Sequence, residues 1–270
     1  MKKILLIATL LLPAVLNAQW TDEYGTWVSV GAKKSLGTQW SLGLEAEYRA
    51  QDNSRWAFGL DAGYKLNKVI KFGAGYTLLY NRRPEKLKGD PTVDDEYTRT
   101  PAYCYPRHRF IVEATADKRF WKWLRVSLRE RYQLTYRPEK DYNKMEYSKV
   151  PIFDDDWNYL GDEWMESVTQ KTKSSTTTQL LRSRLKLEVD KKGWKFTPFA
   201  SAELCNSVRV GDRFNVDKVR TAFGTSYKLN KQHEFTLAYV LTYVFNDDEE
   251  KPDAFNNRIH AVSVGYNFKF

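Results

Sequence analysis

The chain has 270 residues, of which 15% are aromatic and 29% are charged. Its mean hydropathy of −0.63 is too polar for a bundle of membrane-spanning helices, and its aromatic content is too high for a disordered chain. Lys and Arg exceed Asp and Glu, which gives a net charge of +9.

Residues 1–18 have the three-part layout of a secretory signal peptide. Two lysines provide the positive start, an apolar run covers 4–16, and cleavage is predicted after Ala18. The run is too short to span a bilayer as a helix. We therefore predict export through the general secretory route and a mature domain over 19–270, which argues against a nucleic-acid partner.

Alternation of apolar and polar residues predicts β-strands along the mature chain. In segment 181–190, every even-numbered position is charged and the odd-numbered positions are mostly Leu. A helix would mix these two sets around its circumference, whereas a strand separates them onto two faces. The same pattern predicts eleven strands, at residues 24–34, 40–50, 56–65, 70–80, 107–120, 124–137, 181–190, 194–207, 216–229, 233–246 and 257–270.

The lengths of these segments and of their connections favour a membrane barrel. Strands of about ten residues, tilted by ~40°, cross the ~25 Å apolar band of an outer membrane, whereas strands in soluble sandwiches are usually shorter. Short turns such as 35–39 alternate with long connections such as 138–177, and outer-membrane barrels place the short side in the periplasm. The predicted fold class is all-β, a single antiparallel transmembrane β-barrel of about 10–12 strands. Because single-chain bacterial barrels have even strand numbers, we expect ten or twelve.

Aromatic residues concentrate where the strands should cross the two membrane interfaces. Trp40 and Trp123 lie at the predicted short-turn end, and Tyr48 and Trp56 lie toward the other end. Amphipathic rings favour such boundaries. The final strand resembles the C-terminal assembly signal that barrel-assembly machinery recognises, carried by Val264, Tyr266, Phe268 and Phe270.

Four segments together resemble a known family. They are Gln19-Trp20, Tyr24-Gly25-Thr26-Trp27, Glu45-Ala46-Glu47-Tyr48-Arg49 and Val262–Phe270. The chain is similar over nearly its whole mature length to the small Gram-negative outer-membrane barrels of domain of unknown function 2490. The resemblance implies the fold and a location among outer-membrane lipid and lipopolysaccharide, and it brings no catalytic residues.

Signatures of catalysis are sparse. His108, His233 and His260 lie on different segments without metal-ligand spacing. His260 and Ser263 fall on opposite faces of one strand, which is poor geometry for a catalytic dyad. We therefore predict a protein that is not an enzyme and that has no metal and no cofactor. The alternative is a barrel enzyme that acts on lipid or peptide at the extracellular rim.

The two cysteines do not form a disulfide scaffold. Export would permit a bridge, and Cys104 and Cys205 fall near the same predicted end of their strands. One disulfide and two free thiols both fit this placement.

Charged positions that face the predicted lumen form two sets. The lumen-lining basic ladder consists of Arg109, Arg119, Arg125, Arg129, Arg131, Arg182, Arg184 and Lys186. The acidic partners are Glu45, Glu47, Asp61, Glu113, Asp117, Glu188, Glu203 and Glu234. These groups either fill the lumen with salt bridges, as side chains do in barrels near eight strands, or line a narrow channel that favours anions. We favour a largely closed lumen. The leading hypothesis for the function is a structural or surface barrel or a narrow pore for small solutes.

The long connections are acidic. The run Asp154-Asp155-Asp156 in 138–177 offers oxygen ligands for a divalent cation, but the ligand spacing of a calcium loop is absent. We interpret this charge as solvated loop surface.

Overall fold

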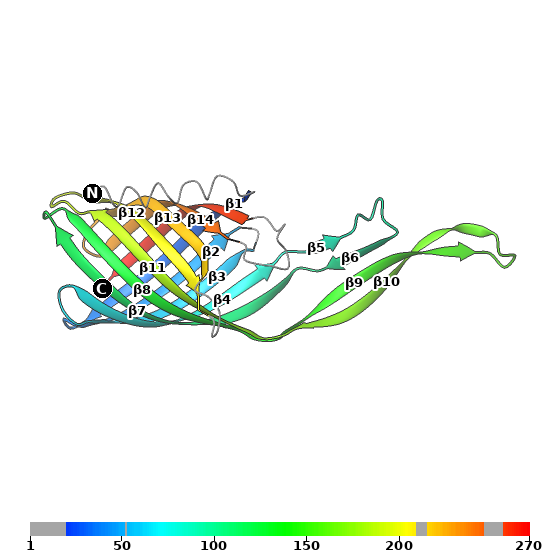
Figure 1. Ribbon diagram of the computed structural model, residues 1–270, viewed down its shortest axis with the longest axis horizontal. Coiled ribbons are helices and arrows are strands. Elements are labelled where there is room, and N and C mark those ends of the chain that lie inside the picture. Colours follow the sequence, from blue (N-terminus) through cyan, green and yellow to red (C-terminus); the bar gives the residue numbers. More distant parts are fainter. Residues whose placement is uncertain (1–19, 52, 209–214, 246–255) are drawn as a thin grey trace.

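The computed structural model describes residues 20–51, 53–208, 215–245 and 256–270, so the predicted signal peptide at 1–18 lies outside the described residues. Eleven strands form a closed barrel, and four more form a sheet that projects from one end of it (Figure 1). The barrel strands are β1 (Trp20–Leu36), β2 (Trp40–Ala50), β3 (Arg55–Lys65), β4 (Ile70–Arg83), β7 (Tyr103–Phe120), β8 (Leu124–Arg137), β11 (Thr176–Val189), β12 (Phe196–Ser207), β13 (Asn215–Lys228), β14 (His233–Val244) and β15 (Asn256–Lys269). The all-β barrel predicted from the sequence is confirmed, and each of the eleven predicted segments overlaps one of its strands.

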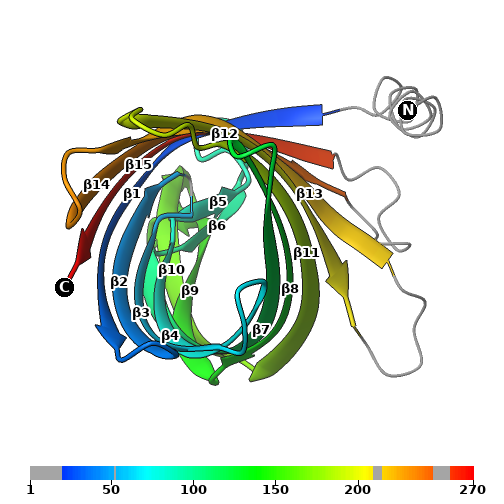
Figure 2. The same ribbon diagram turned by 90° about the vertical axis from the view of Figure 1, so that its left-hand side faces the viewer.

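The barrel closes through β1, which pairs antiparallel with β2 and parallel with β15. Val28, for example, lies opposite Tyr48 on one side and opposite Val264 on the other. The remaining neighbours pair antiparallel, so an odd number of strands makes the first and the last run in the same direction. The view along the barrel shows β1 between β2 and β15 (Figure 2). The expectation of an even strand number is therefore wrong.

The second sheet, called the extension below, is built from the long connections at 81–106 and 138–177. Its strands are β5 (Lys86–Lys88), β6 (Glu96–Thr100), β9 (Lys140–Phe153) and β10 (Tyr159–Lys173), in the order β10-β9-β6-β5. Tyr97 stacks on Tyr147 at 4.5 Å between ring centroids and meets the edge of Trp164 at 5.2 Å. The extension is therefore a stacked β-structure, where the sequence indicated only loops.

The turn at the tip of the β9–β10 hairpin contains the acidic run. The Asp154 carboxylate accepts hydrogen bonds from the backbone N–H groups of Asp156 and Asn158, at 2.9 and 2.7 Å. This carboxylate therefore caps its own turn.

Side chains on the barrel alternate between the outside and the lumen, and the outside is apolar. Leu44, at the centre of β2, is 60% exposed. Each of the other barrel strands also exposes large apolar side chains, among them Val30, Phe58, Phe72, Val112, Leu128, Leu185, Leu204, Phe223, Leu237 and Val262. This arrangement is the inverse of a water-soluble barrel, in which the apolar face fills the interior.

Aromatic rings pair across neighbouring strands at both ends of the barrel. Near the short turns, Trp40 lies 4.9 Å from Tyr64 between ring centroids, and toward the long connections Tyr48 lies 4.5 Å from Trp56. On β15, Val264, Tyr266 and Phe268 have the parity of the outward face, and Phe270 follows at the short-turn end with its ring 4.6 Å from that of Phe268. The barrel thus has an aromatic border at each end.

Candidate functional site

A cavity of about 850 Å³ occupies the part of the lumen next to the short turns. Its lining includes Gly37 and Thr38 of the turn between β1 and β2, so it opens at that end. Eleven Lys and Arg side chains line it against five Asp and Glu side chains, an excess of six positive charges. We call this cavity the cationic chamber.

Glycines on β2, β3 and β4 make room for the chamber. A Cβ at Gly43 would lie 2.3 Å from Asp61 Oδ1, and a Cβ at Gly73 would lie 2.9 Å from Cγ of Glu113. Without side chains at these two positions, the acidic groups can lie close to the wall. Gly59 and Gly75 also line the chamber, so this wall leaves space that long arginine side chains on other strands enter.

The structure places most of the predicted lumen residues around the chamber. The basic members in its lining are Arg109, Arg129, Arg131, Arg182, Arg184 and Lys186, and the acidic members are Glu45, Glu47, Asp61, Glu113 and Glu203. The others have inward parity but lie nearer the short-turn end, outside the lining. These are Arg119, Arg125, Asp117, Glu188 and Glu234.

The groups outside the lining form ion pairs of their own. Arg125 Nη2 lies 2.7 Å from the carboxylate of Asp117, and Arg125 Nη1 lies 3.9 Å from that of Glu188. Arg119 pairs with Asp190, and Glu234 pairs with Lys269. These pairs form a partly exposed charged rim at the short-turn mouth of the barrel.

Glu203 is the most buried carboxylate of the lumen, with 3% of its surface exposed. It accepts a hydrogen bond from Arg182 Nε at 3.1 Å and one from Arg129 Nη2 at 3.0 Å. A third guanidinium, that of Arg220, approaches it to 3.5 Å. One carboxylate thus joins three arginines that come from β8, β11 and β13.

Further contacts extend this cluster on both sides. On one side, Arg182 donates to Gln133 Oε1 at 3.1 Å, and Gln133 and Arg109 both donate to Thr135, at 3.5 and 3.4 Å. On the other side, Arg220 donates to Thr242 Oγ1 at 3.1 Å.

The contacts then continue through Trp27 to β2 and β3. The Arg220 guanidinium carbon lies 5.2 Å from the Trp27 ring centroid, and that of Arg49 lies 3.8 Å from it. Arg49 and Arg55 both pair with Glu47, at 2.7 and 3.1 Å. Side chains from nine of the eleven strands therefore form one continuous network, which we call the polar belt. Its members are Trp27, Glu47, Arg49, Arg55, Arg109, Arg129, Gln133, Thr135, Arg182, Glu203, Arg220 and Thr242.

The polar belt fills the lumen at its level. Gln133 and Thr242 point inward yet are only 2% and 1% exposed. Leu79, an inward residue of β4, is 0% exposed. In a water-filled channel such inward side chains would be exposed to solvent, so their burial shows that side chains occupy the lumen here. The chamber is therefore bounded by the polar belt on one side and open at the short turns on the other.

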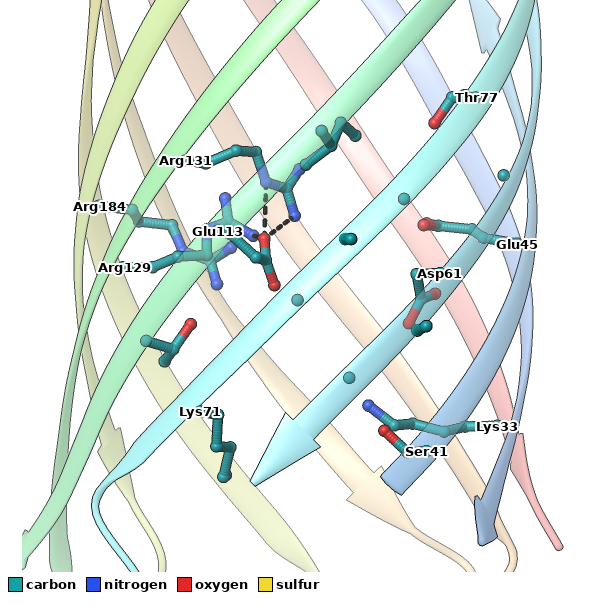
Figure 3. A pocket seen from close by; sticks show the side chains of 18 of the residues that line it. Lys33, Ser41, Glu45, Asp61, Lys71, Thr77, Glu113, Arg129, Arg131 and Arg184 are labelled. Carbon is teal, nitrogen blue, oxygen red and sulfur yellow. Dashed lines mark hydrogen bonds and ion pairs between the residues drawn. The ribbon is translucent and has the colours of Figure 1, made fainter. Parts of the chain in front are cut away.

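Two carboxylates of the chamber lack the partners that the sequence suggested. Glu45 and Asp61 form no ion pair with any described residue, so their expected role as salt-bridge partners is not seen. Figure 3 shows them on the wall of β2 and β3, facing Arg129, Arg131 and Glu113. Arg131 Nη2 pairs with Glu113 at 2.6 Å.

Two arginines of the chamber also lack acidic partners. Within the described part of the chain, Arg184 has neither an ion pair nor a side-chain hydrogen bond, and its Nε is buried without a partner. Arg109 has only its weak hydrogen bond to Thr135. Both side chains line the chamber.

Sequence reasoning missed seven members of the polar belt, which are Trp27, Arg49, Arg55, Gln133, Thr135, Arg220 and Thr242. Gln133, Thr135 and Thr242 have the inward parity of their predicted strands but carry no charge. Arg49 and Arg220 have inward parity on predicted strands, so the alternation could have found them. Arg55 lies just before a predicted strand, and Trp27 lies in the least regular one. Nothing in the sequence spacing indicates that Arg49 and Arg220 both approach the Trp27 ring.

The histidines have partners outside the lumen. Each belongs to the outward set of its strand, with Nδ1 near a tyrosine hydroxyl: His108 with Tyr76 at 2.8 Å, His233 with Tyr266 at 2.7 Å and His260 with Tyr239 at 2.6 Å. Ser263, by contrast, lines the chamber. The separation of His260 and Ser263 onto opposite faces agrees with the strand alternation.

The other candidate chemistry is limited. Cys104 and Cys205 are both free thiols. Across the described ranges, no group of three or more His, Cys, Asp and Glu side chains is placed to hold a metal ion. No helix within these ranges is long and apolar enough to cross a membrane.

Fold and chamber together define a closed β-barrel with an apolar outer surface and a charged, partly filled lumen. The model of the family described as "Protein of unknown function (DUF2490)" matches residues 24–252, and the chain belongs to this family. No curated protein matches the chain. Among solved structures, the chain is similar to the translocator domain of autotransporter NalP from Neisseria meningitidis, with 12% identity and a TM-score of 0.48 over 82% of this chain and 79% of that chain.

Proposed function

We propose that the protein is an integral β-barrel of the Gram-negative outer membrane. The observation that carries this proposal is the apolar outer face, which is exposed on all eleven barrel strands. Contiguous apolar patches beyond a few hundred Å² are rare on water-soluble proteins. On β2, the step from Trp40 to Tyr48 corresponds to about 20 Å along the membrane normal at a tilt of ~40°, close to the ~25 Å apolar band.

In this proposal the signal peptide at 1–18 directs export, and the barrel-assembly machinery reads the C-terminal strand. The short turns lie in the periplasm because that is where outer-membrane barrels place them. The extension, at the opposite end of the barrel (Figure 1), then projects into the layer of lipopolysaccharide.

We further propose that the lumen is a narrow path for small anions that is closed in this conformation. The excess of six positive charges in the chamber supports a preference for anions, as basic rings do in anion-selective pores. The burial of Gln133, Thr242 and Leu79 supports closure at the polar belt. Passage then requires side chains of the belt to move.

Conductance of the refolded, cleaved protein in a planar bilayer tests this path. The wild type should pass almost no current. Trp27→Ala should give discrete current steps, because Trp27 is the largest side chain of the belt and its removal opens space there. Under a salt gradient, the reversal potential of these steps should show anion selectivity. Steady steps from the wild type would contradict closure, and cation selectivity would contradict the role of the arginines. Silence of an inserted Trp27→Ala barrel would leave a structural barrel without a path.

The alternative is an enzyme that acts on lipid or peptide at the rim. One observation favours it: His260 lies between the Tyr239 hydroxyl and the Asp22 carboxylate, at 2.6 Å and 3.4 Å, on the outward face. Ser263 is on the opposite face, so it cannot serve as the nucleophile of this arrangement. Hydrolysis of phospholipid or peptide that is lost in His260→Ala and kept in His233→Ala would support the enzyme.

A further inference from the structure

The charges of the cationic chamber are separated onto facing walls. Glu45 and Asp61 extend from β2 and β3, whereas Arg129, Arg131 and Arg184 extend from β8 and β11 (Figure 3). In the strand order of the barrel, β4 and β7 lie between these two pairs of strands. The two sets therefore face each other across the cavity.

The facing groups are only partly neutralised by the protein. Neither Glu45 nor Asp61 forms an ion pair with a described residue, and the same holds for Arg184 and Arg109. Gly59 lies opposite Glu45 and Gly75 lies opposite Asp61 in the strand pairing, and both glycines line the cavity. They carry no side chain that could fill the space beside these carboxylates.

We propose that the chamber binds a small zwitterion, with its carboxylate on the arginine wall and its ammonium group on Glu45 and Asp61. A short peptide with free termini has this chemistry. This inference rests on the proposed function, because it names the class of solute that enters from the short-turn side. A cavity of about 850 Å³ is roughly 10 Å across if it is equidimensional, and an extended tripeptide spans about the same length.

The general charge excess alone would not produce this preference. It would favour any anion and would repel an ammonium group. Only a local cluster of unpaired carboxylates opposite the arginines makes a molecule with both charges bind better than a simple anion. An ammonium group near two carboxylates in a wet cavity is expected to strengthen binding about tenfold.

Titration calorimetry of the refolded protein in micelles tests the proposal with three matched probes. These are triglycine, which carries both charges, N-acetyl-triglycine, which carries only the negative one, and triglycine amide, which carries only the positive one. We expect triglycine to bind about tenfold more tightly than N-acetyl-triglycine, and triglycine amide to bind most weakly.

Two double variants test whether the preference for triglycine depends on Glu45 and Asp61. The double variant Glu45→Gln, Asp61→Asn should bind triglycine no more tightly than it binds N-acetyl-triglycine. Its affinity for N-acetyl-triglycine should equal or exceed that of the wild type. The matched control, Asp117→Asn combined with Glu188→Gln, changes the same charge at the short-turn rim and should keep the tenfold preference. Faster gel migration of each unboiled variant checks that the barrel has folded.

Equal affinity for triglycine and N-acetyl-triglycine in the wild type would overturn this inference and leave an anion chamber, as the proposed function requires. A tenfold preference that survives the Glu45 and Asp61 substitutions would also overturn it. Binding of none of the three probes would overturn it as well, and the conductance of Trp27→Ala then decides separately whether the path for anions exists.

Discussion

Replacing Glu203 by Gln keeps the shape of the side chain and removes the charge that three arginines share. Arg182 and Arg220 have no other acidic partner among the described residues, whereas Arg129 also lies 3.8 Å from Glu113. Removing one member of a buried ion pair costs about 3–5 kcal/mol, because it leaves an uncompensated charge. The side chains of Arg182 and Arg220 keep 14% and 22% exposure, so water relieves part of this cost. We expect a loss of about 3 kcal/mol in the free energy of unfolding.

The assay is urea unfolding of the refolded protein in lipid vesicles, followed by tryptophan fluorescence. Glu188→Gln is the matched control, because Glu188 pairs with Lys186 at 2.6 Å and with Arg125 at 3.9 Å in the more exposed rim. The side chains of Lys186 and Arg125 keep 24% and 39% exposure, and ion pairs that water reaches contribute less than buried ones, so this control should lose about 1 kcal/mol or less. If Glu203→Gln lost no more than the control, Glu203 would not be the centre of a buried charge network and the polar belt would not fill the lumen as described.

Three further predictions address the outer face, the chamber and the extension. Leu44→Arg should lower the free energy of unfolding in lipid by about 2–4 kcal/mol, because it places a charge at the middle of the apolar band; an unchanged urea midpoint would contradict contact with lipid. In a chain with Cys104 and Cys205 replaced by Ser, Ser41→Cys should react with an impermeant maleimide added from the periplasmic side, and reaction from the outer side alone would contradict the orientation. The hydrogen bonds from Asn158 hold the pKa of Asp154 below its ordinary value of 3.8, so the tip turn is stabilised above that value and loses this stabilisation as the pH falls through the lowered pKa. In a pH titration by nuclear magnetic resonance, the Asn158 amide signal should shift with a midpoint below 3.8, and a midpoint at or above it would refute the cap.

The barrel strands could be predicted because their two faces lie in different surroundings, one apolar and one charged, which makes apolar and polar residues alternate with a period of two. Along 181–190 the odd-numbered positions face outward and the even-numbered positions face a charged lumen, so every second residue is under the same constraint. The number of strands could not be predicted in the same way, because the expectation of an even number rests on other barrels and not on this sequence. The ladder between β1 and β15 is parallel over 14 residue pairs, and the alternation within a strand carries no information about its direction.

The extension could not be predicted from alternation, because neither face of most of this sheet is enclosed. Ring stacking contributes to its packing, such as that of Tyr97 on Tyr147, and these two residues lie 50 positions apart in the sequence. The alternation of apolar and polar residues is weak where both faces are wet, so β9 and β10 look like acidic loops in the sequence.

For the lumen, parity indicates that a side chain points inward but not the height at which it lies. That height depends on strand tilt and on the register of every neighbouring pair. Arg119 and Arg129 have the same parity, yet one belongs to the rim and the other to the Glu203 cluster. For the same reason, the sequence could not indicate that Glu45 and Asp61 stay unpaired.

The central claim is that the apolar outer face of the barrel lies in the outer membrane. The measurement that tests it most directly is the distribution of the protein after a carbonate wash of isolated outer membranes. The account predicts that the protein stays in the membrane pellet, as integral proteins do. Release into the supernatant would contradict it, because a barrel whose eleven strands all face lipid cannot be washed off by a change of pH.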